Sequence, residues 1–152
     1  MKKLFYCAAL MLGLYGCTTV DLYEKTATMS GQEWKSGYKP SFTFEITDTT
    51  SLYQVFFVMR HTDQYKFTNI FIDLGIKAPG SATVVNNRED VTLANNEGWI
   101  GTGMDDIYYH RRALGPPQPF RAGTYTFTLQ QIMREDPLKY VLDAGIRLEK
   151  VR

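Results

Sequence analysis

The chain has 152 residues, with 17 basic and 16 acidic side chains for a net charge of +1, and 14% of its residues are aromatic. This near-neutral balance, without a run of Lys or Arg, lacks the electrostatic footprint of a nucleic-acid-binding protein, so we expect no nucleic-acid partner. The length suits a single domain that buries its own core.

The N-terminus has the three-part order of an exported lipoprotein. A lysine pair is followed by an uncharged apolar run of about a dozen residues at 4–15, which is shorter than the roughly twenty residues of a membrane span. The tetrad LYGC at 14–17 resembles the bacterial lipobox, with Tyr15 larger than usual. We therefore expect residues 1–16 to be a cleaved signal peptide and Cys17 to carry diacylglycerol and acyl chains; an ordinary signal peptide before a free Cys17 is the alternative.

Cleavage before Cys17 would leave one cysteine, because Cys7 departs with the signal peptide. It would also remove two of the 17 basic residues, so 15 basic side chains would stand against 16 acidic ones at a net charge of −1. With its one thiol blocked by lipid, the mature chain has none for a disulfide, a metal or a nucleophile. The fold must therefore rest on a hydrophobic core.

The mature chain divides into a polar N-terminal part and a β-rich remainder. We expect residues 17–38 to be a lipidated N-terminus, a tether and a leading strand or edge segment, and residues 39–152 to form the folded domain. Apolar and polar residues alternate over 42–47, which predicts a half-buried strand. Residues 52–61 are apolar on both faces, which predicts a central strand covered on both sides. Residues 69–78 also have one apolar face.

The remaining strand candidates are shorter or less regular. They lie at 82–85, 90–94, 124–129 and 144–151. The secondary structure of residues 99–114 is ambiguous from their pattern. The prolines within 115–123 exclude a helix in that second segment. We expect at most one short helix, near 130–136, because Pro137 disfavours helical backbone at the residue before it.

Together these patterns predict an all-β protein with a single β-sandwich. They give about seven to nine short strands with turn signals every 8 to 12 residues and no sustained helical period. A jelly-roll arrangement is preferred and an immunoglobulin-like one is the alternative.

The densest polar and aromatic stretch lies between two predicted strands, at 60–69. Its side chains, with two later aromatic residues, form our candidate partner or ligand patch: Arg60, His61, Asp63, Tyr65, Asn69, Trp99 and Tyr108. The alternative is a simple connection in which Asp63 builds a turn and Arg60 pairs with a neighbouring carboxylate.

Catalytic motifs are absent from the sequence, so we expect no enzyme. The two histidines, His61 and His110, lie in separate segments, and a structural role is expected for each. Oxygens of Asp105, Asp106 and residues 95–97 are the best candidates for binding Ca²⁺. They lack the EF-hand spacing, and Ca²⁺ needs six or more converging oxygens, so we expect no cofactor.

Several long segments resemble one protein family. They are PSFTFEITDTTSLYQVFFVMRHTDQYKFTNIFI at 40–72, AGTYTFTLQQIMREDPL at 122–138 and DAGIRLEKV at 143–151. With the lipobox, these segments look like the gliding motility lipoprotein GldH family of Bacteroidota, and the match covers nearly the whole mature chain.

The resemblance implies a non-enzymatic envelope lipoprotein that supports gliding and its associated secretion machinery through contacts with other envelope proteins. Cys17 is the one defined site that carries over, as the lipid anchor in the outer membrane. Only Asp21 is acidic just after Cys17, which favours the periplasmic face. The alternative is a lipid-tethered glycan-binding module, for which Trp34, Trp99, Tyr108 and Tyr109 would supply the stacking surface.

Overall fold

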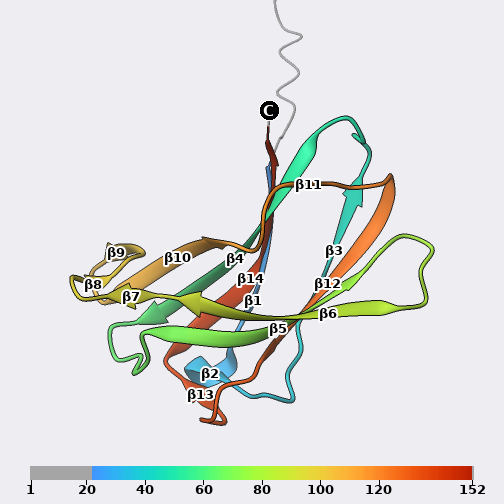
Figure 1. Ribbon diagram of the computed structural model, residues 1–152. Coiled ribbons are helices and arrows are strands. Elements are labelled where there is room, and N and C mark those ends of the chain that lie inside the picture. The colour runs from blue at the N-terminus through green and yellow to red at the C-terminus, as the bar shows by residue number, and fades with distance from the viewer. Residues whose placement is uncertain (1–21, 152) are drawn as a thin grey trace, which may run out of the picture.

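The computed structural model describes residues 22–151. The predicted signal peptide, Cys17 and Asp21 lie outside the described residues. The described chain is a sandwich of two antiparallel sheets, and Figure 1 shows the sheets facing one another. The predicted all-β class is therefore confirmed.

The first sheet has the strand order β1-β14-β4-β10-β9, with β11 also paired to β4. Its strands are β1 (Leu22–Thr28), β4 (Leu52–Thr62), β9 (Thr102–Met104), β10 (Ile107–Ala113), β11 (Gln118–Pro119) and β14 (Val141–Val151). The second sheet has the order β3-β12-β5-β6. Its strands are β3 (Ser41–Ile46), β5 (Asn69–Lys77), β6 (Val84–Thr92) and β12 (Gly123–Gln131).

Short elements complete the described chain. Strand β2 (Glu33–Trp34) pairs with β13 (Leu138–Lys139), and β7 (Ala94–Asn95) pairs with β8 (Gly98–Trp99). One turn of 3-10 helix, η2 (Ser30–Gln32), precedes β2.

The long strands have the topology of a jelly roll. Numbered along the chain, the strands β1, β3, β4, β5, β6, β10, β12 and β14 form one sheet in the order 1-8-3-6 and the other in the order 2-7-4-5. Two interlocking Greek keys give this order. The preferred topology is thus the observed one, rather than the immunoglobulin-like alternative.

Two predicted strands illustrate how the sequence builds the sandwich. In β3, Phe42, Phe44 and Ile46 are buried and the residues between them are exposed. In β4, Phe57 and Val58 point to opposite faces and are both fully buried. On the outer face of β4, the Arg111 guanidinium lies 5.2 Å from the centre of the Phe56 ring and partly covers it.

The sandwich begins before residue 39. Strand β1 pairs along its length with β14, so the leading strand expected within 17–38 lies at the edge of the first sheet. Met29 and Trp34 belong to the core, and the indole N–H of Trp34 donates to the Tyr38 carbonyl. Most of the leading segment is therefore part of the folded domain.

Residues 130–136 contain no helix, in agreement with the expectation of at most one short helix there. Strand β12 continues through Gln131, and the next amides are bonded elsewhere: Ile132 N–H donates to the Phe71 carbonyl, and Met133 N–H to the Gln131 side chain. These donors are therefore not available for helical i→i−4 bonds.

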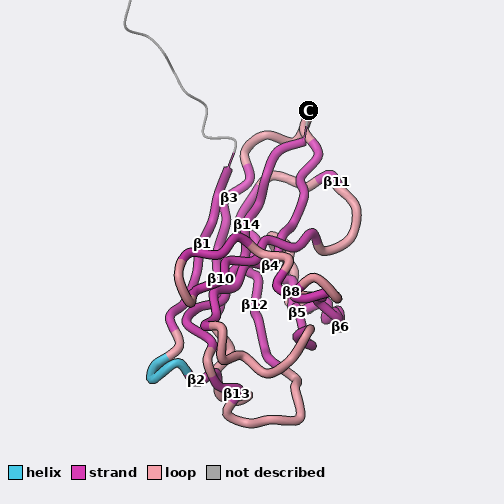
Figure 2. Tube along the Cα trace, turned by 90° about the vertical axis from the view of Figure 1, so that its left-hand side faces the viewer, coloured by secondary structure: helices cyan, strands magenta, loops and turns pink. Residues whose placement is uncertain are grey.

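The two ends of the sandwich differ in what they carry. Leu22 lies opposite Glu149, so the start of β1 and the end of β14 are side by side at one end. Strands β2 and β13 lie at the other end (Figures 1 and 2).

Candidate functional site

The pairing of β4 with β10 brings the two histidines together. Tyr108 lies opposite His61 and His110 lies opposite Met59, all on the inner face of the sheet. The two imidazoles are separated by 49 positions in sequence, yet their Nε2 atoms lie 2.8 Å apart. Both side chains are fully buried.

The hydrogen bonds assign the tautomers of the neutral pair. His61 Nδ1 lies 2.7 Å from the Thr62 carbonyl, which can only accept, so Nδ1 carries the proton. His61 Nε2 is then an acceptor and receives the Nε2–H of His110. The remaining nitrogen, His110 Nδ1, has no hydrogen-bond partner among residues 22–151.

The surroundings keep both histidines neutral. Burial lowers the pKa of His61, against a smaller opposing effect of its bond to Thr62. Burial also lowers the pKa of His110 to about 4, helped by repulsion from His61 and Arg112. A proton on His110 Nδ1 would need an acceptor that the described surroundings do not supply.

Aromatic rings enclose the pair. The Trp99 ring lies 4.4 Å from that of His61, and the rings of Tyr65 and Tyr108 lie at 4.9 and 5.8 Å. We call His61, Tyr65, Trp99, Tyr108 and His110 the histidine–aromatic cluster. Both imidazoles of the cluster are closed to solvent. The packing contacts of the cluster join the end of the first sheet to the β7–β8 hairpin.

The structure therefore brings together four residues of the candidate patch and separates the other three. Arg60 points to the opposite face of the sheet, where its Nε donates to Asp143 at 2.6 Å. Asp63 is exposed in a turn, with its N–H bonded to the Asp106 carbonyl. Asn69 donates from its side chain to Asp90 at 2.6 Å.

The four aromatic residues considered for glycan stacking are not gathered on one exposed surface. Trp34 is in the core, and Trp99 and Tyr108 pack on His61. Tyr109 lies on the other face of its sheet and donates its hydroxyl to Glu24 at 3.0 Å.

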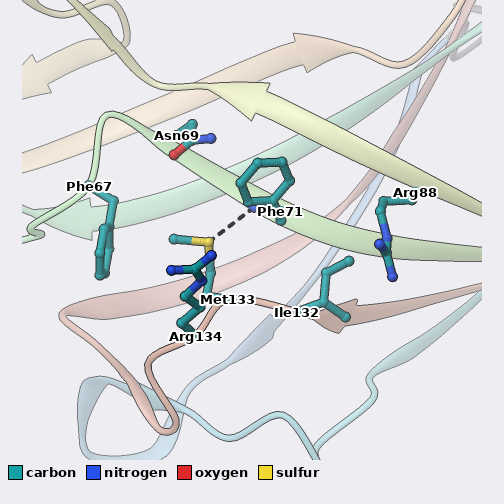
Figure 3. Close-up of a pocket in the computed structure, with 7 residues that line it drawn as sticks. All are labelled: Phe67, Asn69, Phe71, Arg88, Ile132, Met133 and Arg134. Atoms are coloured by element: carbon teal, nitrogen blue, oxygen red, sulfur yellow. Dashed lines mark hydrogen bonds between the residues drawn. The ribbon is translucent and has the colours of Figure 1, made fainter.

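An open hollow lies next to the cluster, on the outer face of the second sheet (Figure 3). Its volume is about 470 Å³. The residues that line it come from β5, β6, the connection before β5 and the segment after β12: Phe67, Asn69, Phe71, Arg88, Ile132, Met133 and Arg134. We call it the Phe71 hollow, since the Phe71 ring, 39% exposed, lies at its centre.

Backbone contacts fix one wall of the Phe71 hollow. Phe71 accepts from Ile132 N–H through its carbonyl at 3.0 Å and donates its own N–H to the Met133 sulfur at 3.2 Å. Gln131, fully buried, anchors this wall by donating to the Trp34 carbonyl. A thioether is a weak acceptor, so the Phe71 N–H is held loosely.

Sequence reasoning named only Asn69 among the residues of the hollow. One signal was present: Phe71 stands at an outward position of β5, between Asn69 and Asp73, where a polar residue would be usual. The contributions of Arg88 and Arg134 depend on strand pairing and on the path of 132–134, which no local pattern contains.

Residues 22–151 contain no group of three or more His, Cys, Asp or Glu side chains placed to hold a metal ion. Asp105 and Asp106 form the turn between β9 and β10, and of residues 95–97 the first ends β7 and the other two form the turn before β8. Within the same range, none of the helical segments has the length and apolar character to cross a membrane.

Comparison with known proteins identifies the family. The family model described as GldH lipoprotein matches residues 21–148. The chain belongs to the GldH lipoprotein family. It is therefore a membrane-anchored protein of the cell envelope, as the resemblance in the sequence implied.

Two curated GldH relatives match at modest identity. The gliding motility lipoprotein GldH homolog of Christiangramia forsetii is 28% identical over 143 residues, covering 88% of this chain and 86% of the relative. The gliding motility lipoprotein GldH of Flavobacterium johnsoniae is 26% identical over 145 residues, covering 90% and 89%.

Solved structures give remote matches. The mosquito-larvicidal Cry4Aa toxin of Bacillus thuringiensis matches 85% of this chain with a TM-score of 0.45 and 11% identity, and the chain spans 21% of the toxin. The VP2 subviral particle of infectious bursal disease virus matches 86% with a TM-score of 0.41 and 17% identity, and the chain spans 32% of VP2.

Proposed function

We propose that this GldH-family protein is a non-enzymatic accessory lipoprotein that supports gliding or secretion-associated machinery through contacts with other envelope proteins. The family match over 21–148, with relatives named for gliding motility, carries the proposal. The closed histidine pair supports the non-enzymatic part, because the imidazole nitrogens are bonded within the core or covered by it.

The lipid anchor is Cys17, and the sandwich stands on the periplasmic face of the outer membrane. Five peptide steps lead from Cys17 to Leu22, where β1 begins. At about 3.3–3.6 Å per residue they hold this end of the sandwich within about 18 Å of the anchor. The end that carries β2 and β13 then points away from the membrane (Figure 1).

Genetic replacement in the bacterium that encodes the chain tests the proposal. The wild-type gene and the Cys17→Ser variant replace the native copy, and cells are crosslinked before detergent solubilisation and affinity purification. We expect the wild type to co-purify with a defined set of envelope proteins and Cys17→Ser to leave the outer-membrane fraction. Recovery of the wild-type chain alone, under several crosslinkers, would overturn the accessory role.

Protease treatment of intact cells tests the orientation. A periplasmic sandwich resists added proteinase until the outer membrane is permeabilised. Rapid digestion in intact cells would place the domain outside the cell and contradict the proposed face.

A further inference from the structure

We propose that the Phe71 hollow binds an extended acidic segment of a partner protein, with acidic side chains held by Arg88 and by Arg134 and a large apolar side chain on the floor. This inference deepens the proposed function, because it rests on the partner being a protein.

Charge complementarity is the reason that we expect acidic residues in the partner segment. Among the described residues, neither the Arg88 nor the Arg134 guanidinium takes part in a hydrogen bond or ion pair. Asp73 lies opposite Arg88 in the β5–β6 register without forming an ion pair with it. The planar guanidinium of an arginine matches the fork geometry of a carboxylate, and Arg88 and Arg134 lie on different sides of the hollow (Figure 3), so each can bind one acidic side chain.

The apolar floor of the hollow is the reason that we expect a large apolar side chain in the partner segment. Phe67, Phe71, Ile132 and Met133 line the hollow, and the Phe71 ring is 39% exposed although it sits on a strand. A cavity of about 470 Å³ accommodates an aromatic or large aliphatic side chain. Burying such a side chain adds the hydrophobic contribution that charges alone do not provide.

The neighbouring strand edge gives the extended conformation. Strand β6 ends the sheet order, so its outer edge has no strand partner among residues 22–151. Seven of its nine residues are exposed, and Arg88 is at its centre. A peptide that adds to this edge would gain backbone hydrogen bonds and carry its side chains into the hollow.

Selection from a random peptide library tests the chemistry of the segment directly. The full lipoprotein in lipid nanodiscs is panned against random 12-residue peptides displayed on phage, after depletion on empty nanodiscs. We expect the selected peptides to share acidic residues next to an aromatic or large aliphatic residue. No enriched family, or a family without acidic residues, would overturn the proposal.

Titration of one selected peptide, labelled with fluorescein, tests the residues. We expect Arg88→Gln/Arg134→Gln to weaken binding at least about tenfold, because each charged hydrogen bond is strong. The matched control is Arg121→Gln, an exposed arginine just before β12. Equal weakening by the control, or no weakening by the double variant, would contradict the site.

Two altered peptides test whether binding needs the acidic residues and whether the segment pairs with β6. Replacement of the acidic residues by Asn or Gln should abolish binding, and N-methylation of alternate amides should weaken it at least about tenfold if the segment pairs with β6. Unchanged binding of the N-methylated peptide would overturn the strand-pairing mode. If no peptide binds while crosslinked envelope proteins still co-purify, the docking site is contradicted and the accessory role is retained.

Discussion

The histidine–aromatic cluster and the Phe71 hollow are neighbours built from the same stretch of chain, yet they differ in closure. The Tyr65 ring of the cluster lies 5.8 Å from the Phe67 ring of the hollow. In the cluster, Tyr65 and both histidines are buried, whereas Phe71 in the hollow is 39% exposed.

The difference comes from what each region packs against. The β7–β8 hairpin places Trp99 over His61 and seals the cluster. No such hairpin covers the hollow, which is open, and two guanidiniums at its lining have no partner in the described chain. The cluster is therefore closed by packing, and the hollow is accessible from solvent.

The largest expected effect comes from making the same kind of truncation in both regions and comparing the two. Tyr65→Ala removes a buried ring and its hydroxyl bond to the Asn69 carbonyl, so we expect a loss of about 3–5 kcal/mol in the free energy of unfolding. Phe71→Ala removes a ring that is already partly solvated and should cost only about 1 kcal/mol. Urea unfolding followed by circular dichroism measures both. Equal costs would mean that the two regions do not differ in closure.

Acid should weaken the cluster before it affects the carboxylates. His110 has a folded pKa of about 4, below the unfolded value of 6.5, and the His61 pKa is also lowered. The unfolded chain therefore binds more protons, and stability present above pH 6.5 is lost as pH falls toward 4, by about 3 kcal/mol for His110 alone.

Unfolding curves between pH 7 and 4.5 measure this loss. The His61→Gln/His110→Gln variant is the control, and its unfolding free energy should change much less over this range. A wild-type profile as flat as that of the variant would contradict the neutral buried pair.

A third test adds volume where the cluster is tightest. A Cβ on Gly101 would lie 2.4 Å from the Tyr109 carbonyl oxygen and 2.9 Å from His110 Nδ1. Gly101→Ala should therefore cost about 1–3 kcal/mol through overpacking. Gly37→Ala is the matched control, because nothing lies within 4 Å of its added Cβ. Similar melting temperatures for the two variants would show that the cluster can relax.

The strands of the sandwich also show which parts of the fold the sequence predicts. The alternation of Phe42, Phe44 and Ile46 predicts β3 because one buried face imposes a two-residue period. Residues 52–61 predict the central β4 for a different reason, since a strand covered on both sides is apolar on both faces. The absence of a helix at 130–136 agrees with the expectation of at most one there, but the sequence does not show that Gln131 is a buried polar anchor bonded across the fold, a role that no local pattern records.

The candidate site was partly predictable. His61, Tyr65, Trp99 and Tyr108 were named and do converge, but the sequence does not reveal that His110 joins them, because that depends on the β4–β10 register. The hollow depends on pairing as well, since the β5–β6 ladder brings Arg88 to the same hollow as Phe71. Burial and facing direction are properties of the assembled sheets.

The smallest expected effect is the one that separates binding from stability. The Arg88 and Arg134 guanidiniums form no ion pair within the described chain, so Arg88→Gln/Arg134→Gln should change the free energy of unfolding by no more than about 0.5 kcal/mol. The urea midpoint and slope should both match those of the wild type. A loss above about 1 kcal/mol would mean that the arginines stabilise the sandwich, and the hollow would then be a structural surface rather than a docking site.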